Sequence, residues 1–155
     1  MREFVSDFYA AMSLMRNVRR ALASTVKLSS AEWSVMLAVW YLGRSGETTV
    51  RDIADHLHVA AAHMTAEIGK LVAAGLLVKR AHPTDGRAVG IHMTKAGQDM
   101  FRRISPILRE VNDDLFVRIP YADMVIVHRF LRSIIAQAPA AVRVAERYLP
   151  EDKAT

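Results

Sequence analysis

The segment from Lys79 to Thr94 holds the side chains best suited to contact a polyanion. Residues 83–86 (Pro-Thr-Asp-Gly) form a turn sequence, because proline fixes one φ angle, aspartate bonds its own backbone and glycine accepts a positive φ. Short β-prone runs flank this turn at 76–80 and 88–93, which predicts a β-hairpin. Arg87 stands near the predicted tip, where its guanidinium suits phosphate oxygens or a narrow DNA minor groove.

Other side chains are candidates for contacts with the same polyanion. A helix expected at about 61–74 carries His63 and Thr65 in its first turn, where they can reach base edges. For His63, a phosphate contact or no contact is an open alternative. Phosphate contacts are expected from four cations, and simple surface charge is the alternative reading for each of them: Arg51, Lys70, Lys79 and Arg80. Asp85 is expected to brace the hairpin by pairing with an arginine.

Composition agrees with an anionic partner. The 155 residues carry a formal net charge of +5 with a sequence pI of about 9.9, which favours nucleic acid first and a membrane surface second. The chain has no cysteine, which excludes disulfides, thiolate metal sites and cysteine nucleophiles. A hydrophobic fraction of 52% suggests burial of apolar surface between subunits. With no signal peptide and no apolar run of membrane-spanning length expected, a soluble cytoplasmic protein without membrane association is predicted.

Enzyme and metal chemistry find little support in the sequence. There is no nucleophile elbow, phosphate-binding glycine loop or recognisable carboxylate pair, so no enzyme activity and no cofactor are expected. His56 and His58 lie two residues apart on a predicted helix and point to different faces, which disfavours chelation. We therefore predict no metal site.

The elements that must position these residues are mostly helices. Amphipathic spacing predicts a helix at 4–23. A second helix, capped by Ser29 or Ser30, is expected to run to Leu42; it is apolar on most sides and is expected to be buried. A short strand is expected at 48–50, then a helix to 58 begun by a Thr49–Asp52 capping box, then the 61–74 helix ended by Gly75. Thr94 is expected to cap a helix at 95–116 that kinks or breaks at Pro106. Further helices are expected from Pro120 to 136 and over 140–149.

This order predicts a mainly α fold with a small β-hairpin wing, namely a winged helix-turn-helix domain with terminal helices for dimerisation. We expect one chain-length unit, residues 1–155. Within it, 29–97 is the predicted DNA-binding region, and 1–25 and 98–150 are the predicted dimerisation region.

In this order of elements the sequence resembles the MarR family of bacterial transcriptional regulators. The matching positions run from Leu28 to Gly97: Leu28-Ser29, Trp33, Leu37, the helix at 49–57, Gly75-Leu76, Asp85-Gly86-Arg87 and the run Met93 to Gly97. The resemblance implies a homodimer on double-stranded DNA, with one recognition helix per major groove and one wing per subunit. A ligand-responsive repressor of a pseudo-palindromic operator is therefore expected.

The resemblance also implies a small-molecule effector site between the first, second and fifth helices. In the matching region lie six residues with aromatic, thioether or cationic side chains: Met12, Arg16, Arg20, Trp33, Met36 and Trp40. Such a site suits an aromatic carboxylate. The alternative reading of the apolar members is plain core.

Two departures from the family pattern weaken the expected DNA contacts. Gly86 occupies a place where the family commonly has a cation, and the recognition helix starts with alanines at 60–62 instead of carrying an early arginine. Each missing phosphate contact lowers the salt dependence of binding by about one ion. A winged-helix protein-interaction module with weak or no DNA binding is therefore the alternative function.

Overall fold

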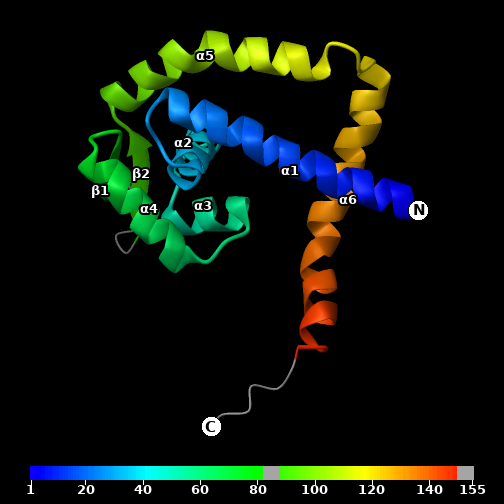
Figure 1. Cartoon of the computed structure of the whole chain (residues 1–155). Coiled ribbons are helices and arrows are strands. Elements are labelled where there is room, and N and C mark those ends of the chain that lie inside the picture. The colour runs from blue at the N-terminus through cyan, green and yellow to red at the C-terminus, as the bar shows by residue number, and fades with distance from the viewer. Residues whose placement is uncertain (82–87, 150–155) are drawn as a thin grey trace. The chain divides into compact units, whose positions relative to one another are not determined.

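The computed structural model describes residues 1–81 and 88–149 of the chain (Figure 1). Its elements run in the following order: α1 (Arg2–Thr25), α2 (Ser30–Leu42), α3 (Val50–Leu57), α4 (Ala61–Ala73), β1 (Leu77–Ala81), β2 (Val89–Met93), α5 (Lys95–Phe116) and α6 (Tyr121–Glu146). The fold is mainly α with one antiparallel hairpin, as predicted. The predicted turn, with Asp85, Gly86 and Arg87, lies outside the described residues.

Local capping chemistry sets the starts of α2 and α3. Ser29, and not Ser30, caps α2: its hydroxyl accepts the Glu32 amide at 3.1 Å, and its own amide donates to Glu32 Oε2 at 2.7 Å. Thr49 and Asp52 form the same reciprocal pair at the start of α3, as the sequence predicts. Each box satisfies backbone donors that a helix start leaves without a partner.

The end of α4 also follows the prediction. Gly75 has φ +72° after the last helical residues, and its amide donates to the Val72 carbonyl while the Leu76 amide donates to the Leu71 carbonyl. Glycine adopts this left-handed conformation without a Cβ penalty. The chain therefore leaves α4 in the direction that β1 requires.

Three sequence expectations are corrected. The predicted strand at 48–50 is a single bridge from Thr49 to Gly90, because the capping box already draws Val50 into α3. The helix at 95–116 is not broken, since α5 runs through Pro106. The helices expected at 120–136 and 140–149 are one helix, α6, which continues through Pro139. A proline removes one backbone hydrogen bond, and the remaining bonds of a long helix maintain it.

The core packs α2 against α3, α4 and the hairpin. Its largest fully buried side chains include Trp33, Met36, Ile53, Ile68 and Leu71. The prediction that α2 is mainly buried is confirmed for Trp33, Val35, Met36, Ala38 and Val39. It is wrong at the end of the helix, where Trp40 is 46% and Tyr41 64% exposed. This core fixes α4 and the hairpin relative to one scaffold helix, α2.

The chain divides into two compact units, residues 1–110 and 111–155. The first unit therefore includes α1 and most of α5 beside the predicted DNA-binding region, and the domain boundaries predicted from the sequence remain a prediction. In the second unit, α6 has no buried residue.

The expectation that no apolar run approaches membrane-spanning length is wrong for α6. Among the helices in the described part of the chain, α6 alone is long and apolar enough to cross a membrane, with a mean hydropathy of 1.2 over 18 residues. Helices buried in a subunit interface share this length and composition.

Candidate nucleic-acid interface and ligand cavity

Helices α3 and α4 form a helix-turn-helix whose second helix exposes its first turns. The turn contains His58 with φ +55°, and its amide donates to the Asp55 carbonyl. Met64, Ile68 and Leu71 bury one face of α4 in the core. The opposite face of the first turns is exposed to solvent, at Ala61, Ala62, His63, Thr65 and Ala66. The two predicted base-contacting residues, His63 and Thr65, therefore lie on the accessible face.

Three of the predicted contact residues already have partners within their own helices. The Thr65 hydroxyl donates to the Ala61 carbonyl at 3.0 Å. Arg51 Nε lies 3.7 Å from Asp55 Oδ2, with both side chains largely exposed.

Lys70 Nζ lies 2.7 Å from Glu67 Oε1, and the Glu67 side chain is only 7% exposed. This hydrogen bond raises the pKa of Lys70 above its usual value. A phosphate contact by Lys70 must therefore compete with a nearly buried carboxylate.

The two remaining predicted phosphate contacts, Lys79 and Arg80, lie on the wing. Strands β1 and β2 pair from Leu77↔Met93 to Ala81↔Val89. Lys79 and Arg80 are both exposed, and as neighbours on β1 they point to opposite faces of the hairpin. Neither has an ion pair among the residues that the structure describes.

The loop before α3 anchors the wing through β2. The Ile91 amide donates to the Thr48 carbonyl at 2.7 Å, and His92 Nε2 lies 3.0 Å from Glu47 Oε2. Gly90 makes room for this pair, because a Cβ there would lie 2.6 Å from Glu47 Oε2. The wing is thus attached to the helical core at its second strand.

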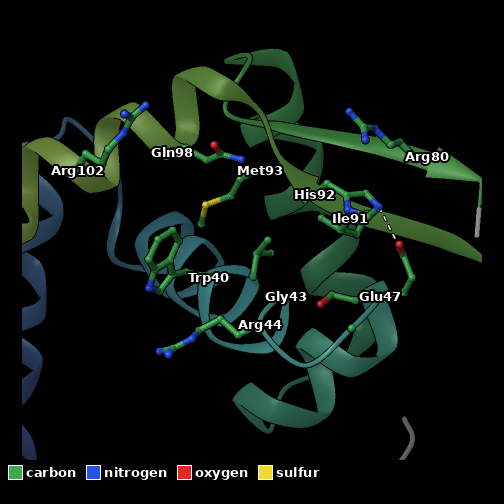
Figure 2. Close-up of a pocket in the computed structure, with 13 residues that line it drawn as sticks. Trp40, Gly43, Arg44, Glu47, Arg80, Ile91, His92, Met93, Gln98 and Arg102 are labelled. Atoms are coloured by element: carbon green, nitrogen blue, oxygen red, sulfur yellow. Dashed lines mark ion pairs between the residues drawn. The ribbon is translucent and has the colours of Figure 1, made fainter.

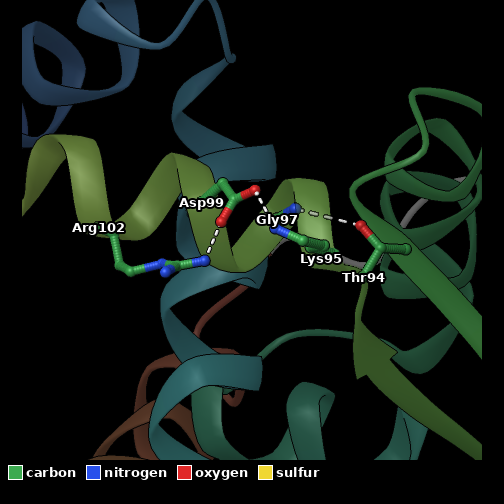
Figure 3. A network of polar contacts seen from close by, with 5 residues as sticks. All are labelled: Thr94, Lys95, Gly97, Asp99 and Arg102. Atoms are coloured by element: carbon green, nitrogen blue, oxygen red, sulfur yellow. Dashed lines mark hydrogen bonds and ion pairs between the residues drawn. The ribbon is translucent and has the colours of Figure 1, made fainter.

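The base of the wing is fixed where β2 leads into α5 (Figure 3). Thr94 Oγ1 donates to the Gly75 carbonyl at 2.6 Å and accepts the Gly97 amide at 3.1 Å, which confirms Thr94 as the cap of α5. A Cβ on Gly97 would lie 2.4 Å from the Leu76 carbonyl oxygen. Further along α5, Asp99 pairs with Lys95 and Arg102, and the hydrogen bond from Lys95 is the main cause of its lowered pKa.

An open cavity of about 1010 Å³ lies between the end of α2, the loop before α3, the wing and the start of α5 (Figure 2). Its lining includes three arginines, Arg44, Arg80 and Arg102, and the exposed ring of Trp40. Figure 2 shows Trp40 between Arg102 and Arg44 in this view. The hydroxyl of Thr48, another lining residue, is buried without a hydrogen-bond partner in the described structure. Cations beside an aromatic ring suit an anion that carries an aromatic group.

This cavity includes only Trp40 from the six predicted effector-site residues. Trp33 and Met36 are 0% exposed, and Trp33 stacks on Phe101 with ring centroids 5.4 Å apart. The plain-core reading therefore fits Trp33 and Met36. Met12 is 50% exposed on α1.

The two predicted arginines are bonded within α1. Arg16 donates to Ser13 Oγ and Arg20 to Asn17 Oδ1, each at 3.0 Å.

Sequence reasoning missed most of the cavity lining, including Arg44, Glu47, His92, Gln98 and Arg102. One local signal was present, because Arg44 follows Trp40 by four residues, one helical turn. Glu47 comes from the loop before α3, and His92, Gln98 and Arg102 come from the wing and α5. No helical spacing relates these residues to Trp40, so the sequence offered no comparable signal for them.

Comparison with known proteins places this fold in one family. The MarR family model matches residues 30–88. The curated HTH-type transcriptional repressor IacR of Pseudomonas putida is 24% identical over 119 residues, covering 77% of this chain and 69% of its own.

Two solved structures with ligands share the fold at low sequence identity. CouR of Rhodococcus jostii RHA1, bound to p-coumaroyl-CoA, is 17% identical with a TM-score of 0.74, covering 84% of this chain and 91% of its own. The Staphylococcus aureus MepR–DNA complex is 14% identical with a TM-score of 0.71, covering 84% and 93%. The MarR family model thus matches the winged-helix region of this chain, and the likeness to the solved structures shows that the chain has the fold of MarR winged-helix transcriptional regulators.

Proposed function

We propose that this protein is a cytoplasmic, ligand-responsive repressor that binds a pseudo-palindromic DNA operator as a homodimer. The observation that carries the proposal is the accessible start of α4 beside two wing cations, Lys79 and Arg80, that have no ion pair in the described part of the chain. MepR, which has the same fold, is solved in complex with DNA. Two copies of α4 related by two-fold symmetry would read half-sites about 10 bp apart.

The DNA contacts divide into base reading and phosphate binding. His63 and Thr65 on α4 are the proposed base-contacting residues, and Thr65 also offers its methyl group to thymine. Lys79 and Arg80 are the leading phosphate contacts in the described structure, because no carboxylate holds them. Arg87 remains the proposed wing-tip contact, with Asp85 as its brace.

Dimerisation is proposed from apolar side chains that a single chain leaves in water. On α1 the exposed set is Phe4, Val5, Tyr9, Met12, Leu14 and Met15. On α6 it includes Val125, Ile126, Val127, Leu131, Ile134 and Ile135. Faces of this size on long helices are typical of subunit interfaces, because burying them removes apolar area from water.

We propose that the effector is an aromatic carboxylate bound in the cavity beside Trp40. The ring of Trp40 stacks on Phe101 with centroids 5.2 Å apart and is still 46% exposed, so it can contact an aromatic ligand from the cavity. Arg44 lacks an ion pair within residues 1–81 and 88–149. CouR, of the same fold, is solved with an aryl thioester ligand. Since Arg80 and His92 of the wing line the same cavity, an anion bound there would change the charge and position of the wing.

Selection of bound duplexes from a random pool, followed by salt titration, tests the DNA proposal. A palindromic consensus and a steep fall of affinity with rising salt are expected, because phosphate contacts release counterions. The protein-interaction module is favoured by the engagement of Thr65, Arg51 and Lys70 within their own helices. Absence of duplex binding at low salt would support that module and contradict the repressor.

Tryptophan fluorescence tests the effector site. The chain has two tryptophans, so Trp33→Phe leaves Trp40 as the sole reporter. 4-Hydroxyphenylacetate is expected to change this emission, and its neutral analogue 4-hydroxyphenylethanol is not. Arg44→Gln should weaken the affinity for 4-hydroxyphenylacetate about tenfold, as expected for loss of a charge-assisted hydrogen bond.

Arg16→Gln separates the cavity from the site predicted on α1. An unchanged response in Arg16→Gln with a weakened one in Arg44→Gln supports the cavity. The reverse pattern supports the α1 site, and equal binding of the neutral analogue rejects a carboxylate effector.

A further inference from the structure

A second cavity, of about 470 Å³, lies between the end of α1, the residue before β1 and the middle of α5. Its apolar lining is aliphatic or thioether, from Val26, Leu76, Met100, Ile104 and Ile107. In contrast to the cavity beside Trp40, it has no aromatic lining residue. Such a surface fits a flexible alkyl chain better than a flat ring.

The polar lining of this second cavity is cationic. Lys27 and Arg103 both line it and are exposed, and neither has an ion pair in the described part of the chain. The third polar residue, Thr25, donates its hydroxyl to the Leu22 carbonyl at 2.6 Å. Among the residues that the structure describes, no acidic residue lines the cavity. Its charge therefore complements an anion.

Lys27 also occupies a backbone position that disfavours lysine. Its φ is +58°, in the left-handed region, and the Leu28 amide donates to the Ala23 carbonyl across it. This arrangement ends a helix and usually has glycine at the left-handed residue. Lysine there costs conformational free energy, which points to a use for its ammonium group outside the fold.

We propose that this cavity is a separate binding site for an alkyl carboxylate of medium chain length. The chain would lie on the apolar side chains, with the carboxylate between Lys27 and Arg103. Two cations above an aliphatic surface match both ends of such a ligand. The site shares no lining residue with the cavity beside Trp40, so either site can be wrong without the other.

The position of Leu76 connects this site to the wing. Its carbonyl accepts the Thr94 amide at 3.0 Å and lies against Gly97 of α5. Leu76 also follows directly after Gly75, which ends α4. A ligand in contact with Leu76 therefore touches the junction of the recognition helix, the wing and α5. Through this junction, binding would alter duplex affinity, a consequence that rests on the proposed DNA binding.

Calorimetric titration of the full chain with octanoate tests the site directly. Octanoate is expected to bind, and octan-1-ol, which lacks the charge, to bind about tenfold more weakly. Lys27→Gly should also weaken octanoate binding about tenfold while leaving the thermal midpoint unchanged or higher, because glycine relieves the left-handed backbone. Equal binding of the alcohol, no octanoate binding, or full affinity in Lys27→Gly would each overturn the proposal.

Ile107→Trp and Arg44→Gln locate the binding event. Ile107 is 40% exposed at the cavity, so tryptophan there fills space without burying new bulk in the core. Ile107→Trp should abolish octanoate binding, and Arg44→Gln in the other cavity should leave it intact. The opposite pattern would overturn the assignment. Sedimentation provides a second check. If octanoate or Ile107→Trp dissociated the dimer, this surface would be a contact between two copies of the chain, and the assignment would be overturned.

Discussion

At the scale of single residues, the predicted DNA contacts differ in whether a carboxylate already holds the cation. The Arg51–Asp55 pair is exposed and weak, so a phosphate can replace Asp55 at little cost. Lys70 pairs with a nearly buried Glu67, and taking the cation away would leave that carboxylate without its partner. Lys79 and Arg80 carry no such cost in the described structure. We therefore rank the wing cations above those of the helices.

Arg87→Ala is expected to weaken binding to the selected operator by about 1–3 kcal/mol while leaving the dimer intact. The expected cause is the loss of a wing contact with no second cation at Gly86. Titrating operator duplex at moderate salt measures the effect, with Arg19→Ala on α1 as the matched control. Wild-type affinity in Arg87→Ala would remove this residue from the interface.

Gly97→Ala is expected to destabilise the fold by about 1–3 kcal/mol, because a Cβ would lie 2.4 Å from the Leu76 carbonyl. Gly69 in α4 is the matched control, since a Cβ there meets nothing within 4 Å. Gly69→Ala should instead stabilise the helix by about 0.5–1 kcal/mol. Denaturant unfolding of both variants measures the difference. If the two variants were equally stable, the contact between Gly97 and the Leu76 carbonyl would accommodate a Cβ by a small shift.

At the scale of elements, capping and anchoring decide where the recognition helix and the wing stand. The capping boxes start α2 and α3 at defined residues, and α2 is the helix on which α4 packs. The wing is attached along β2, where Thr48 contacts Ile91 and Glu47 contacts His92, and directly after β2, where Thr94 contacts Gly75. Because each attachment is polar and local, each can be weakened singly.

The capping box of α2 predicts a pH dependence of stability. The hydrogen bond from the Ser29 amide lowers the pKa of Glu32 below 4.5, despite partial burial that opposes the shift. A lowered folded pKa contributes stability that is present above the unfolded value and lost as the pH falls through the folded value. Glu32→Gln should therefore destabilise the protein at neutral pH by an amount that shrinks below pH 4.5.

Denaturant unfolding of wild type and Glu32→Gln between neutral and acidic pH measures this dependence. Ser29→Ala, which removes the cap hydroxyl, is expected to cost about 1 kcal/mol at neutral pH. A difference between wild type and Glu32→Gln that stays constant down to acid would contradict the role given to the carboxylate charge.

At the scale of the whole molecule, the main feature is that a single chain leaves many apolar side chains exposed to solvent. Side chains on α1 and α6 are exposed at levels that burial between two copies would remove. The same exposure gives α6 the length and hydropathy of a membrane helix. The proposed association with a second copy would bury such apolar side chains.

Val5→Glu combined with Ile126→Glu is expected to dissociate the dimer at concentrations where wild type remains dimeric. Both positions are exposed in the single chain, at 42% and 55%, so the folded subunit tolerates the charges. Sedimentation velocity across a dilution series measures the dissociation constant of the dimer. This constant should rise by more than about tenfold, because the interface would bury charges without partners. A dimer unaffected by both charges would place the interface elsewhere.

Much of the fold was predictable because its signals are local. The boxes at Ser29 and Thr49, the left-handed Gly75 and the cap at Thr94 each depend on residues within a few positions. Two helix boundaries differ from the prediction, because α5 is not broken at Pro106 and α6 is one helix where two were expected. Proline propensity is a local cost, and the hydrogen bonds of the rest of a long helix outweigh it.

By itself, the sequence determined the order of the helices, the hairpin and the family resemblance, since these follow from spacing and capping along one chain. Only the tertiary structure decided that the carboxylate paired with Lys70 is nearly buried, that Trp33 and Met36 are core, and that Trp40 shares a cavity with Arg80 and Arg102. Those properties depend on residues far apart in sequence meeting across α2, α5 and the wing. Local hydrophobic periodicity does not indicate which distant residues come into contact.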